Sequence, residues 1–258
     1  MNADMNADFR ESHRPVRQQV AILAAGRGTR LGRPHPKPLT RLEDGRTILG
    51  SQLENAAQAF DNPQIYIVVG FKLDMILEAY PAGVFVYNED YAQTNTSKSL
   101  LRLLRATGDG GVVWMNGDVV FDQELLALTI PLIEDEQSFI AVNTAKVDEE
   151  EVKYTVDADG WINELSKSVV GALGEAVGVN FVAAADKDAL IARLDEVDDQ
   201  DYFERGIELT IQRDGVRYAP LDITRLSAIE VDTPEDLALA NASLHHDVAQ
   251  SAHRSGFA

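Results

Sequence analysis

Residues 20–39 read VAILAAGRGTRLGRPHPKPL, and this stretch decides how the rest of the chain is interpreted. Its first four residues are apolar, which is typical of a buried strand in a mostly parallel sheet. Gly26 and Gly28 follow among small residues, which let a backbone adopt positive φ and pass close to a ligand. The same stretch carries four cations: Arg27, Arg30, Arg33 and Lys37. A strand that leads into a small-residue turn rich in cations predicts an anion site, most often for a phosphate chain.

Two common phosphate-binding motifs do not fit this spacing. A dinucleotide fingerprint needs a third small residue three positions after Gly28, where Leu31 stands. A Walker-type phosphate loop ends in Gly-Lys-Ser/Thr, and the chain contains no Gly-Lys pair. The anion site is therefore expected to be of another kind.

The composition is that of an ordinary globular protein with a well-buried core. The 258 residues are 45% hydrophobic and 25% charged, which suits one large α/β domain. No apolar run approaches the length of a transmembrane helix, and the first residues lack the apolar core of a secretory signal. We therefore expect a cytoplasmic enzyme without membrane insertion. The chain has no cysteine, which excludes disulfides, thiolate metal sites and a cysteine nucleophile.

The charge distribution is more informative than its total. The formal net charge of −19 disfavours a nucleic-acid partner. Between Arg27 and Arg46, however, six Lys or Arg residues stand against two acids, which gives a local charge of +4. A local excess against the overall sign predicts a small anionic ligand rather than a polyanion.

Strands and helices alternate in the first half of the chain. Apolar runs predict strands over 65–69, 84–87 and 111–115, and helical spacing predicts helices over 47–60 and 73–80 and from 97 onward. This alternation predicts a parallel sheet that is covered by helices on both faces.

The second half of the chain is less regular. We expect strands over 139–143 and 177–183, helices over 122–133, 188–194 and 202–212, and a hairpin over 153–165 with a tight Asp159-Gly160 turn. The acidic run 148–151 is expected to be a solvated turn. A last strand should end in 229–232, before a helix that begins at Pro234. We expect the domain to span 19–242, between a flexible arm at 1–18 and a flexible tail at 243–258.

Three polar features follow strands of the predicted parallel sheet. The cationic turn follows the first strand, the polar segment 88–97 follows the third, and Asp118 follows the fourth. Ligands of such sheets lie beyond the carboxyl ends of the strands, so all three features should converge on one edge. Asp232 follows the last strand and is expected at the same edge. A turn residue is the alternative for Asp118, and a helix N-cap is the alternative for Asp232.

Residues 23–31, LAAGRGTRL, and 36–38, PKP, resemble the signature of the nucleotidyltransferases that use nucleoside triphosphates, L-A-A-G-x-G-T-R-[LM] followed by P-K-P. The resemblance covers residues 20–242. It implies a single Rossmann-like domain with a mostly parallel central sheet, helices on both faces and a smaller mixed β region on the acceptor side. It also implies attack of a phosphorylated acceptor on the α-phosphorus, so that positioning and charge neutralisation supply most of the rate.

The resemblance assigns roles to residues of this chain. Arg30 would neutralise the leaving pyrophosphate, Lys37 would bridge the α-phosphate and the incoming group, and Asp118 and Asp232 match the positions that bind Mg²⁺. The turn that holds the nucleotide would comprise Leu23, Ala24, Ala25, Gly26, Gly28 and Thr29. Lys167 is the candidate for a lysine that holds the acceptor phosphate. It lacks the family's Glu-Lys-Pro context, and a solvated hairpin lysine is the alternative.

The segment 88–100 resembles the phosphocholine cytidylyltransferase branch of these enzymes, through Asn88-x-x-Tyr91, an asparagine at 95 and Ser99-Leu100. This resemblance implies CTP as the nucleotide, with Asn95 and Thr96 at the base or ribose. Polar loop caps are the alternative for both. The Gly-Leu pair of the sugar-phosphate enzymes is absent from this segment. The L-A-G-G and D-K elements of the molybdopterin guanylyltransferase branch do not match either.

A choline-like acceptor would need aromatic faces and an acid. Tyr202, Glu204 and Trp161 could supply them, although aromatic side chains on a helix are also typical of a core. Aminoethylphosphonate, inositol phosphate and sugar or polyol phosphates fit as well. A sugar-phosphate enzyme using another nucleotide, a nucleotide-sugar glycosyltransferase of similar fold and a non-catalytic nucleotide-binding domain remain open. We expect small-molecule substrates, and the sequence is compatible with a homo-oligomer.

Overall fold

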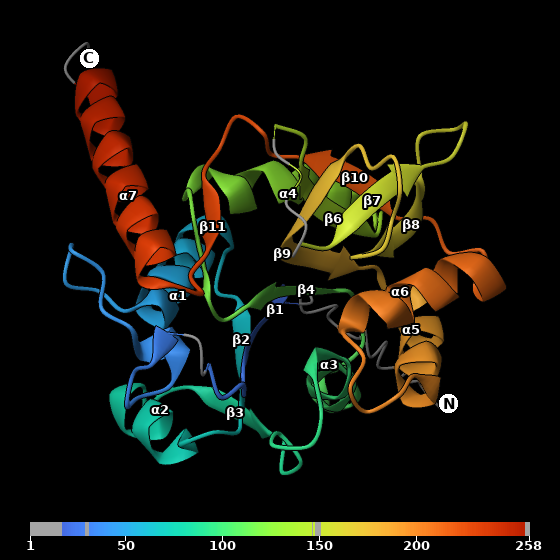
Figure 1. Ribbon diagram of the computed structural model, residues 1–258, viewed down its shortest axis with the longest axis horizontal. Coiled ribbons are helices and arrows are strands. Elements are labelled where there is room, and N and C mark those ends of the chain that lie inside the picture. The colour runs from blue at the N-terminus through green and yellow to red at the C-terminus, as the bar shows by residue number, and fades with distance from the viewer. Residues whose placement is uncertain (1–16, 29–30, 146, 148–150, 256–258) are drawn as a thin grey trace, which may run out of the picture.

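The computed structural model describes residues 17–28, 31–145, 147 and 151–255. Its central strand, β1 (Gln19–Ala24), lies between β4 (Val112–Asn116) and β2 (Gln64–Val69), and β3 (Val84–Tyr87) forms the outer edge beside β2 (Figure 1). All four strands run parallel. This arrangement confirms the parallel sheet that the alternating pattern predicts.

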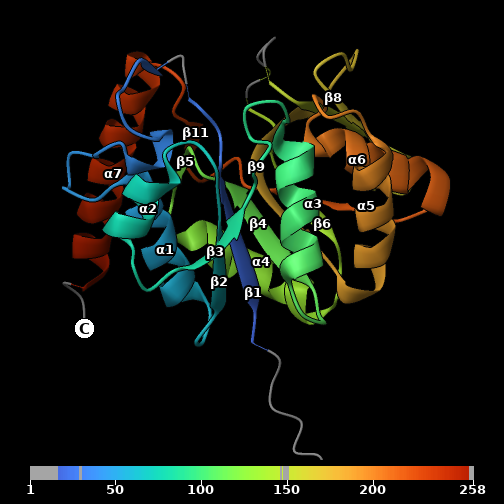
Figure 2. The same cartoon turned by 90° about the horizontal axis from the view of Figure 1, so that it is seen from below.

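Helices cover both faces of this sheet, as Figure 2 shows. One face is covered by α1 (Ile48–Ala59), α2 (Leu73–Ala79) and α4 (Glu124–Glu134), and the other by α3 (Thr96–Ala106), α5 (Ala184–Glu196) and α6 (Phe203–Leu209) with its π-helical extension η3 (Thr210–Asp214). Side chains of β1 alternate between the two apolar clusters, Val20 and Ile22 toward one and Ala21 and Leu23 toward the other. Because β1 is buried on both faces, its sequence is a continuous apolar run.

A smaller mixed β region continues the sheet beyond β4. It contains β6 (Phe139–Asn143), the hairpin of β7 (Lys153–Val156) and β8 (Ile162–Ser166), β9 (Gly174–Val182) and β10 (Ala219–Asp222). Strand β9 runs antiparallel to both β4 and β6. Strand β10 is not among the strands expected from the sequence; it includes Pro220 and pairs with β6 at the edge of the sheet. Proline is tolerated there because an edge strand can lack one donor.

The last predicted strand lies outside the main sheet. It is the short β11 (Ala228–Glu230), which pairs antiparallel with β5 (Val119–Phe121). Strand β5 begins directly after Asp118, and the Val231 N–H donates to the Asp118 carbonyl over 2.9 Å. Asp118 and Asp232 therefore approach each other through a separate two-stranded sheet.

Helix α7 (Pro234–Ser255) ends the described chain and projects from the body of the molecule (Figure 1). Its backbone is helical beyond residue 242, where the sequence analysis places the end of the domain. The limits 1–18, 19–242 and 243–258 stay predictions. None of the described helices is both long and apolar enough to cross a membrane.

Candidate active site

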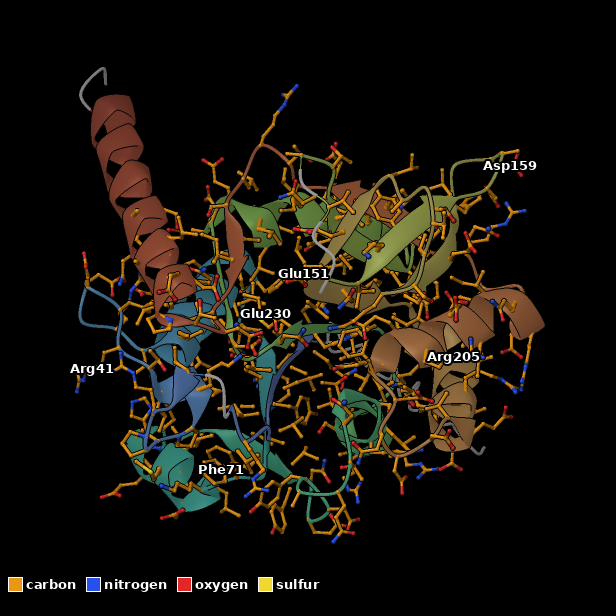
Figure 3. The ribbon with its side chains drawn as sticks, in the orientation of Figure 1. Arg41, Phe71, Glu151, Asp159, Arg205 and Glu230 are labelled. Carbon is orange, nitrogen blue, oxygen red and sulfur yellow. The ribbon has the colours of Figure 1, made fainter. Side chains whose placement is uncertain are left out.

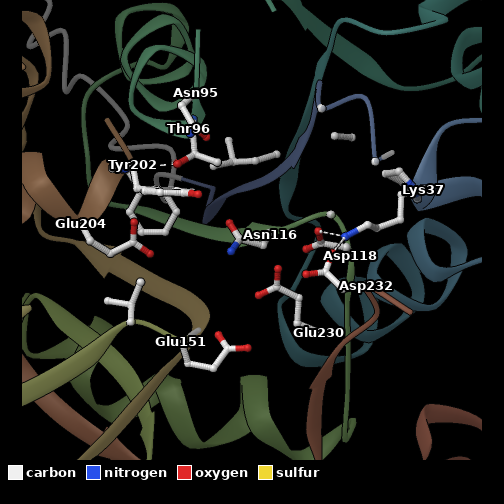
Figure 4. Close-up of a pocket in the computed structure, with 18 of the residues that line it drawn as sticks. Lys37, Asn95, Thr96, Asn116, Asp118, Glu151, Tyr202, Glu204, Glu230 and Asp232 are labelled. Carbon is white, nitrogen blue, oxygen red and sulfur yellow. Dashed lines mark hydrogen bonds and ion pairs between the residues drawn. The ribbon is translucent and has the colours of Figure 1, made fainter. Parts of the chain in front are cut away.

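A cavity of about 320 Å³ opens above the carboxyl ends of β1 and β4 (Figure 4). Leu23 and Ala24 of β1 and Asn116 and Gly117 at the end of β4 line it, together with the starts of α3 and α6. This is the edge at which the sequence predicts convergence. Most of the predicted site residues line the cavity: Leu23, Ala24, Gly26, Gly28, Lys37, Asn95, Thr96, Asp118, Lys167, Tyr202, Glu204 and Asp232.

One predicted site residue, Ala25, is placed differently. Ala25 is buried and does not line the cavity, and its carbonyl accepts a hydrogen bond from the Phe71 N–H over 3.0 Å. The alanine thus fixes the turn after β1 against the start of α2. Thr29 and Arg30 lie outside the described residues.

The two glycines of the turn differ in what they require. Gly28 has φ +55°, and a Cβ at this position would stand 2.9 Å from the Cβ of Lys37. A side chain there would combine an unfavourable backbone conformation with a clash against the lysine stem. At Gly26 a Cβ meets no atom of the described residues within 4 Å, and φ is not positive. Positive φ is therefore needed at Gly28 and not at Gly26.

The cationic run does not converge on the cavity as a whole. Among its described members, Lys37 lines the cavity, whereas Arg27, Arg33, Arg41 and Arg46 do not. Arg46 instead forms ion pairs with Asp44 and Glu54, each at 2.6 Å. Figure 3 shows Arg41 at the outer edge of the molecule, far from Glu230 and Glu151 in its interior. The local charge of +4 thus overstates the positive charge at the site.

Lys37 lies in the 3₁₀ turn η2 (Lys37–Leu39), between Pro36 and Pro38. Its side chain is buried, and its ammonium donates to Asp118 Oδ2 over 2.8 Å and to Asp232 Oδ1 (Figure 4). Burial opposes the charge of this ammonium, but Asp118 and Asp232 outweigh it and raise the pKa of Lys37. The lysine is therefore a fixed cation at one end of the cavity.

The capping role considered for Asp232 is filled by its neighbours. Thr233 Oγ1 accepts from the Asp236 N–H, and Asp236 Oδ2 accepts from the Thr233 N–H over 2.8 Å. These reciprocal bonds form a capping box at the start of α7. The Asp232 carboxylate instead pairs with Lys37, so the N-cap alternative is wrong.

A third carboxylate, Glu230, joins the two aspartates. Carboxylate oxygens of Asp118, Glu230 and Asp232 all lie within 4.8 Å of one another. The nearby Asp118 carboxylate, together with burial, raises the pKa of Glu230 to about 9. Glu230 is not among the site residues predicted from the sequence. Side-chain alternation could have found it, because residues two apart in an extended segment share a side.

The acidic cluster has the chemistry of a site for a hard divalent cation. Asp118 Oδ1 is enclosed and has no hydrogen-bond partner among the described residues. Magnesium prefers carboxylate oxygens and needs only one or two of them from the protein. The three carboxylates could therefore hold such a cation, because Lys37 pairs with only one oxygen of Asp118 and leaves Oδ1 without a partner among the described residues.

The opposite end of the cavity has a different composition. Tyr202 and Glu204 come from the start of α6, and Lys167 follows β8. The Lys167 ammonium lies over the Tyr202 ring, 5.1 Å from its centroid. Glu151 also lines this end, although the run to which it belongs is predicted to be a solvated turn. Residues 148–150 of that run lie outside the described residues.

Glu204 is the most deeply buried acid at this end, with 8% of the residue exposed. Its Oε2 atom is enclosed without a hydrogen-bond partner among the described residues. Burial raises the pKa of Glu204 to about 7, even though Lys167 acts in the opposite direction. Trp161, which the sequence analysis grouped with Glu204, does not line the cavity and packs beneath Arg217.

Asn95 and Thr96 line the cavity but also hold α3 against the segment before α6. The Asn95 side-chain amide donates to the Gln200 carbonyl over 3.2 Å, and Thr96 Oγ1 accepts from the Phe203 N–H over 3.1 Å. Asn95 is also the N-cap of α3. Their proposed contacts with the base or ribose stay predictions.

Residues 20–197 match the family model described as the MobA-like NTP transferase domain. CMP-5'-(3-aminopropyl)phosphonate synthase from Streptomyces rubellomurinus is 29% identical over 243 residues, which is 86% of this chain and 38% of that protein. The bifunctional protein GlmU from Koribacter versatilis is 35% identical over 101 residues, 39% of this chain and 21% of GlmU. The chain thus covers much less than two thirds of either relative.

Two solved structures share the fold. LicC, the CTP:phosphocholine cytidylyltransferase from Streptococcus pneumoniae, superimposes with a TM-score of 0.69 at 21% identity, over 89% of this chain and 100% of that chain. The inositol-1-phosphate CTP transferase from T. maritima gives 0.72 at 15% identity, over 85% of this chain and 91% of that chain. At these identities the likeness establishes the nucleotidyltransferase fold.

Proposed function

The chain belongs to the MobA-like NTP transferase family, and we propose that it transfers CMP from CTP to a small acceptor that carries a phosphate or phosphonate group. It is an NTP-dependent nucleotidyltransferase by family. The observation that carries the proposal is the fixed ammonium of Lys37 beside three carboxylates, at the edge where β1 and β4 end.

The transfer makes one bond to phosphorus and breaks another. An ionised oxygen of the acceptor attacks the α-phosphorus of the triphosphate, and the bond from that phosphorus to the oxygen bridging toward the β-phosphate breaks. Pyrophosphate leaves with the electron pair, and the acceptor becomes linked to CMP. Because the attacking oxygen is already ionised, the protein needs no strong base and must supply position and charge.

Lys37 is suited to this task because its charge and place are both fixed. Its stem passes against Gly28, and its ammonium is held by Asp118 and Asp232. In the proposed reaction, Lys37 contacts the α-phosphate and the incoming oxygen, where negative charge is shared in the transition state. Arg30 is assigned to the leaving pyrophosphate. Leu23, Ala24, Ala25, Gly26, Gly28 and Thr29 are assigned to the nucleotide.

Asp118, Glu230 and Asp232 would hold Mg²⁺ in this proposal. When bound there, the ion neutralises charge on phosphate oxygens. The enclosed, unpartnered Asp118 Oδ1 supports the fit. Since Lys37 shares two of the carboxylates, the protein brings a lysine charge and a metal site to the same point of the cavity.

The choice of cytidine rests on the segment 88–100 and on the relatives. Asn88 is buried, and its side-chain amide donates to Ser99 Oγ over 3.0 Å, so this pattern shapes the loop before α3. The phosphonate synthase and both solved structures carry CMP or CTP in their names. A phosphocholine-like or aminoalkylphosphonate acceptor agrees with Tyr202 and Glu204 at the far end of the cavity.

The test is a pyrophosphate-release assay with Mg²⁺, each of the four NTPs, and phosphocholine, 2-aminoethylphosphonate, inositol phosphate and glucosamine 1-phosphate as acceptors. We expect release with CTP and with phosphocholine or 2-aminoethylphosphonate, and mass spectrometry should identify the CMP conjugate. Faster turnover of another NTP with the sugar phosphate would favour the alternative of a sugar-phosphate nucleotidyltransferase. CTP binding without turnover on any acceptor would favour a nucleotide-binding domain.

A further inference from the structure

We propose that the far end of the cavity selects an acceptor with a terminal primary ammonium over one with a quaternary ammonium, and that Glu204 is the residue that recognises it. This inference rests on the proposed function, because it assumes that the acceptor occupies the cavity beyond Lys37. It names the acceptor class as an ω-aminoalkyl phosphate or phosphonate.

Glu204 is positioned to receive a hydrogen-bond donor. Figure 4 shows its carboxylate directed from α6 toward the middle of the cavity, near Tyr202 and at the end opposite Lys37. Only 8% of the residue is exposed, and Oε2 has no hydrogen-bond partner among the described residues. An enclosed carboxylate oxygen without a partner is costly, because burial removes its hydration without replacing it.

The obvious cation of this end does not neutralise Glu204. The Lys167 ammonium lies over the Tyr202 ring, and no ion pair between Lys167 and Glu204 occurs among the described residues. The enclosed Glu204 oxygen therefore favours a ligand that brings a cation of its own.

The aromatic residues do not form an open cage for a quaternary ammonium. Lys167 already lies over the ring of Tyr202. Phe203 packs edge-on against Trp114, with ring centroids 5.7 Å apart, and Trp161 is stacked by Arg217 away from the cavity. Recognition of a quaternary ammonium depends on free aromatic faces. The described residues of this end offer few of them.

A primary ammonium and a quaternary ammonium carry the same charge but differ in hydrogen bonding. The primary group has three N–H donors, and one of them can satisfy Glu204 Oε2 by a charge-assisted bond. The quaternary group has no donor and would leave that oxygen buried and unsatisfied. A hydroxyl can donate but brings no charge to the carboxylate. The primary ammonium is thus the group that meets both needs.

The first measurement compares four acceptors of equal length: phosphoethanolamine and its mono-, di- and trimethylated forms, the last being phosphocholine. With CTP and Mg²⁺, we expect kcat/KM to fall along the series, by about tenfold or more from the primary to the quaternary amine, as sites built for a donor reject analogues that lack it. The hydroxyl analogue, 2-hydroxyethylphosphonate, is compared with 2-aminoethylphosphonate and should also be poorer.

The second measurement repeats the series with Glu204→Gln and with Glu208→Gln as a matched control. Glu208 lies on the same helix, is similarly buried and pairs with Arg205, but it does not line the cavity. We expect Glu204→Gln to raise the KM of the primary amine and to bring the ratio between the two ends of the series near unity, whereas Glu208→Gln keeps the ratio. Thermal unfolding of both variants checks that each one folds.

The outcomes separate this inference from the proposed function. Equal or better use of phosphocholine, or a ratio that survives in Glu204→Gln, would overturn the assignment of Glu204 while CMP transfer stands. Transfer from another nucleotide to a sugar phosphate, with none from CTP to any amine, would overturn both.

Discussion

The two ends of the cavity are built in opposite ways. At the Lys37 end, segments after β1, β4 and β11 are tied together by ion pairs of one lysine with two aspartates. At the Glu204 end, the lysine lies on a ring and the buried acid has an oxygen without a partner. At the first end, Lys37 pairs with two of the three clustered carboxylates, whereas at the second no ion pair of Glu204 occurs among the described residues. We expect this contrast if the Lys37 end holds the reacting phosphate groups and the Glu204 end recognises the acceptor.

The largest effect should come from removing the fixed cation. With Lys37→Met, we expect kcat to fall by about a thousandfold, because loss of one preorganised charge at a developing negative centre costs this much in closed sites. Lys167→Met removes the same charge from the other end and should act mainly on the KM of the acceptor. Steady-state kinetics on both variants measure these effects. If both variants lost kcat to the same extent, the proposed difference between the two ends would be contradicted.

A smaller loss is expected at the carboxylates. Asp118→Asn should lower kcat/KM by about a hundredfold and raise the Mg²⁺ concentration needed for half-maximal rate, since a bound metal supplies several kcal/mol of charge stabilisation. Glu151→Gln is the control, because Glu151 lines the cavity but is not one of the three clustered carboxylates. Binding of Mn²⁺ measured by electron paramagnetic resonance gives a readout that does not depend on turnover. Unchanged Mn²⁺ affinity in Asp118→Asn would exclude it as a ligand.

The predictability of the two ends differs for a physical reason. The Lys37 end follows from local sequence, because an apolar strand, a glycine turn and a Pro-Lys-Pro element are contiguous in the chain. The alternation of strands and helices then places Asp118 at the same edge. Alternation in the extended segment 229–232 puts Glu230 on the same side as Asp232, but its approach to Asp118 depends on the pairing of β11 with β5 across more than a hundred positions of sequence.

The Glu204 end could be predicted only in part. Tyr202 and Glu204 stand out as an aromatic and an acid beside each other, and both line the cavity. Their partners could not be found in the same way. The stacking of Lys167 on Tyr202 and of Arg217 on Trp161 depends on how the β7–β8 hairpin packs near α6 and β10. Such contacts join residues that no local pattern connects.

The pH dependence of acceptor binding should distinguish the Glu204 end from the Lys37 end. Glu204 has a pKa of about 7 in the folded protein, above its ordinary value of 4.5, so it loses its proton near neutral pH. Lys167 and Glu151 are the charged groups that act on it, in opposite directions. A primary ammonium binds the ionised form. We therefore expect the acceptor KM to fall by about tenfold from pH 6 to pH 8, following the ionised fraction.

The Glu204→Gln variant separates this titration from that of the acceptor phosphate. Its KM should keep only the dependence that comes from the phosphate, so the ratio of the two KM values reports Glu204 alone. A KM ratio that does not change with pH would contradict the buried, unpaired state of Glu204.

The raised pKa of Glu204 also affects the stability of the fold. Since the raised pKa favours the protonated form in the folded state, Glu204 destabilises the fold progressively as the pH rises from about 4.5 to 7.

The smallest predicted effect concerns the turn that supports Lys37. Gly28→Ala should lower the free energy of unfolding by about 1–2 kcal/mol, because a Cβ is unfavourable at positive φ. The same Cβ would press on the Lys37 stem at 2.9 Å. Gly26→Ala is the matched control for stability, since its Cβ meets no atom within 4 Å in the part of the chain that the structure describes, and its φ is not positive. Urea unfolding without nucleotide measures both. Equal stabilities would mean that the turn does not constrain the lysine, and the rigidity of the Lys37 end would then have to come from the aspartates alone.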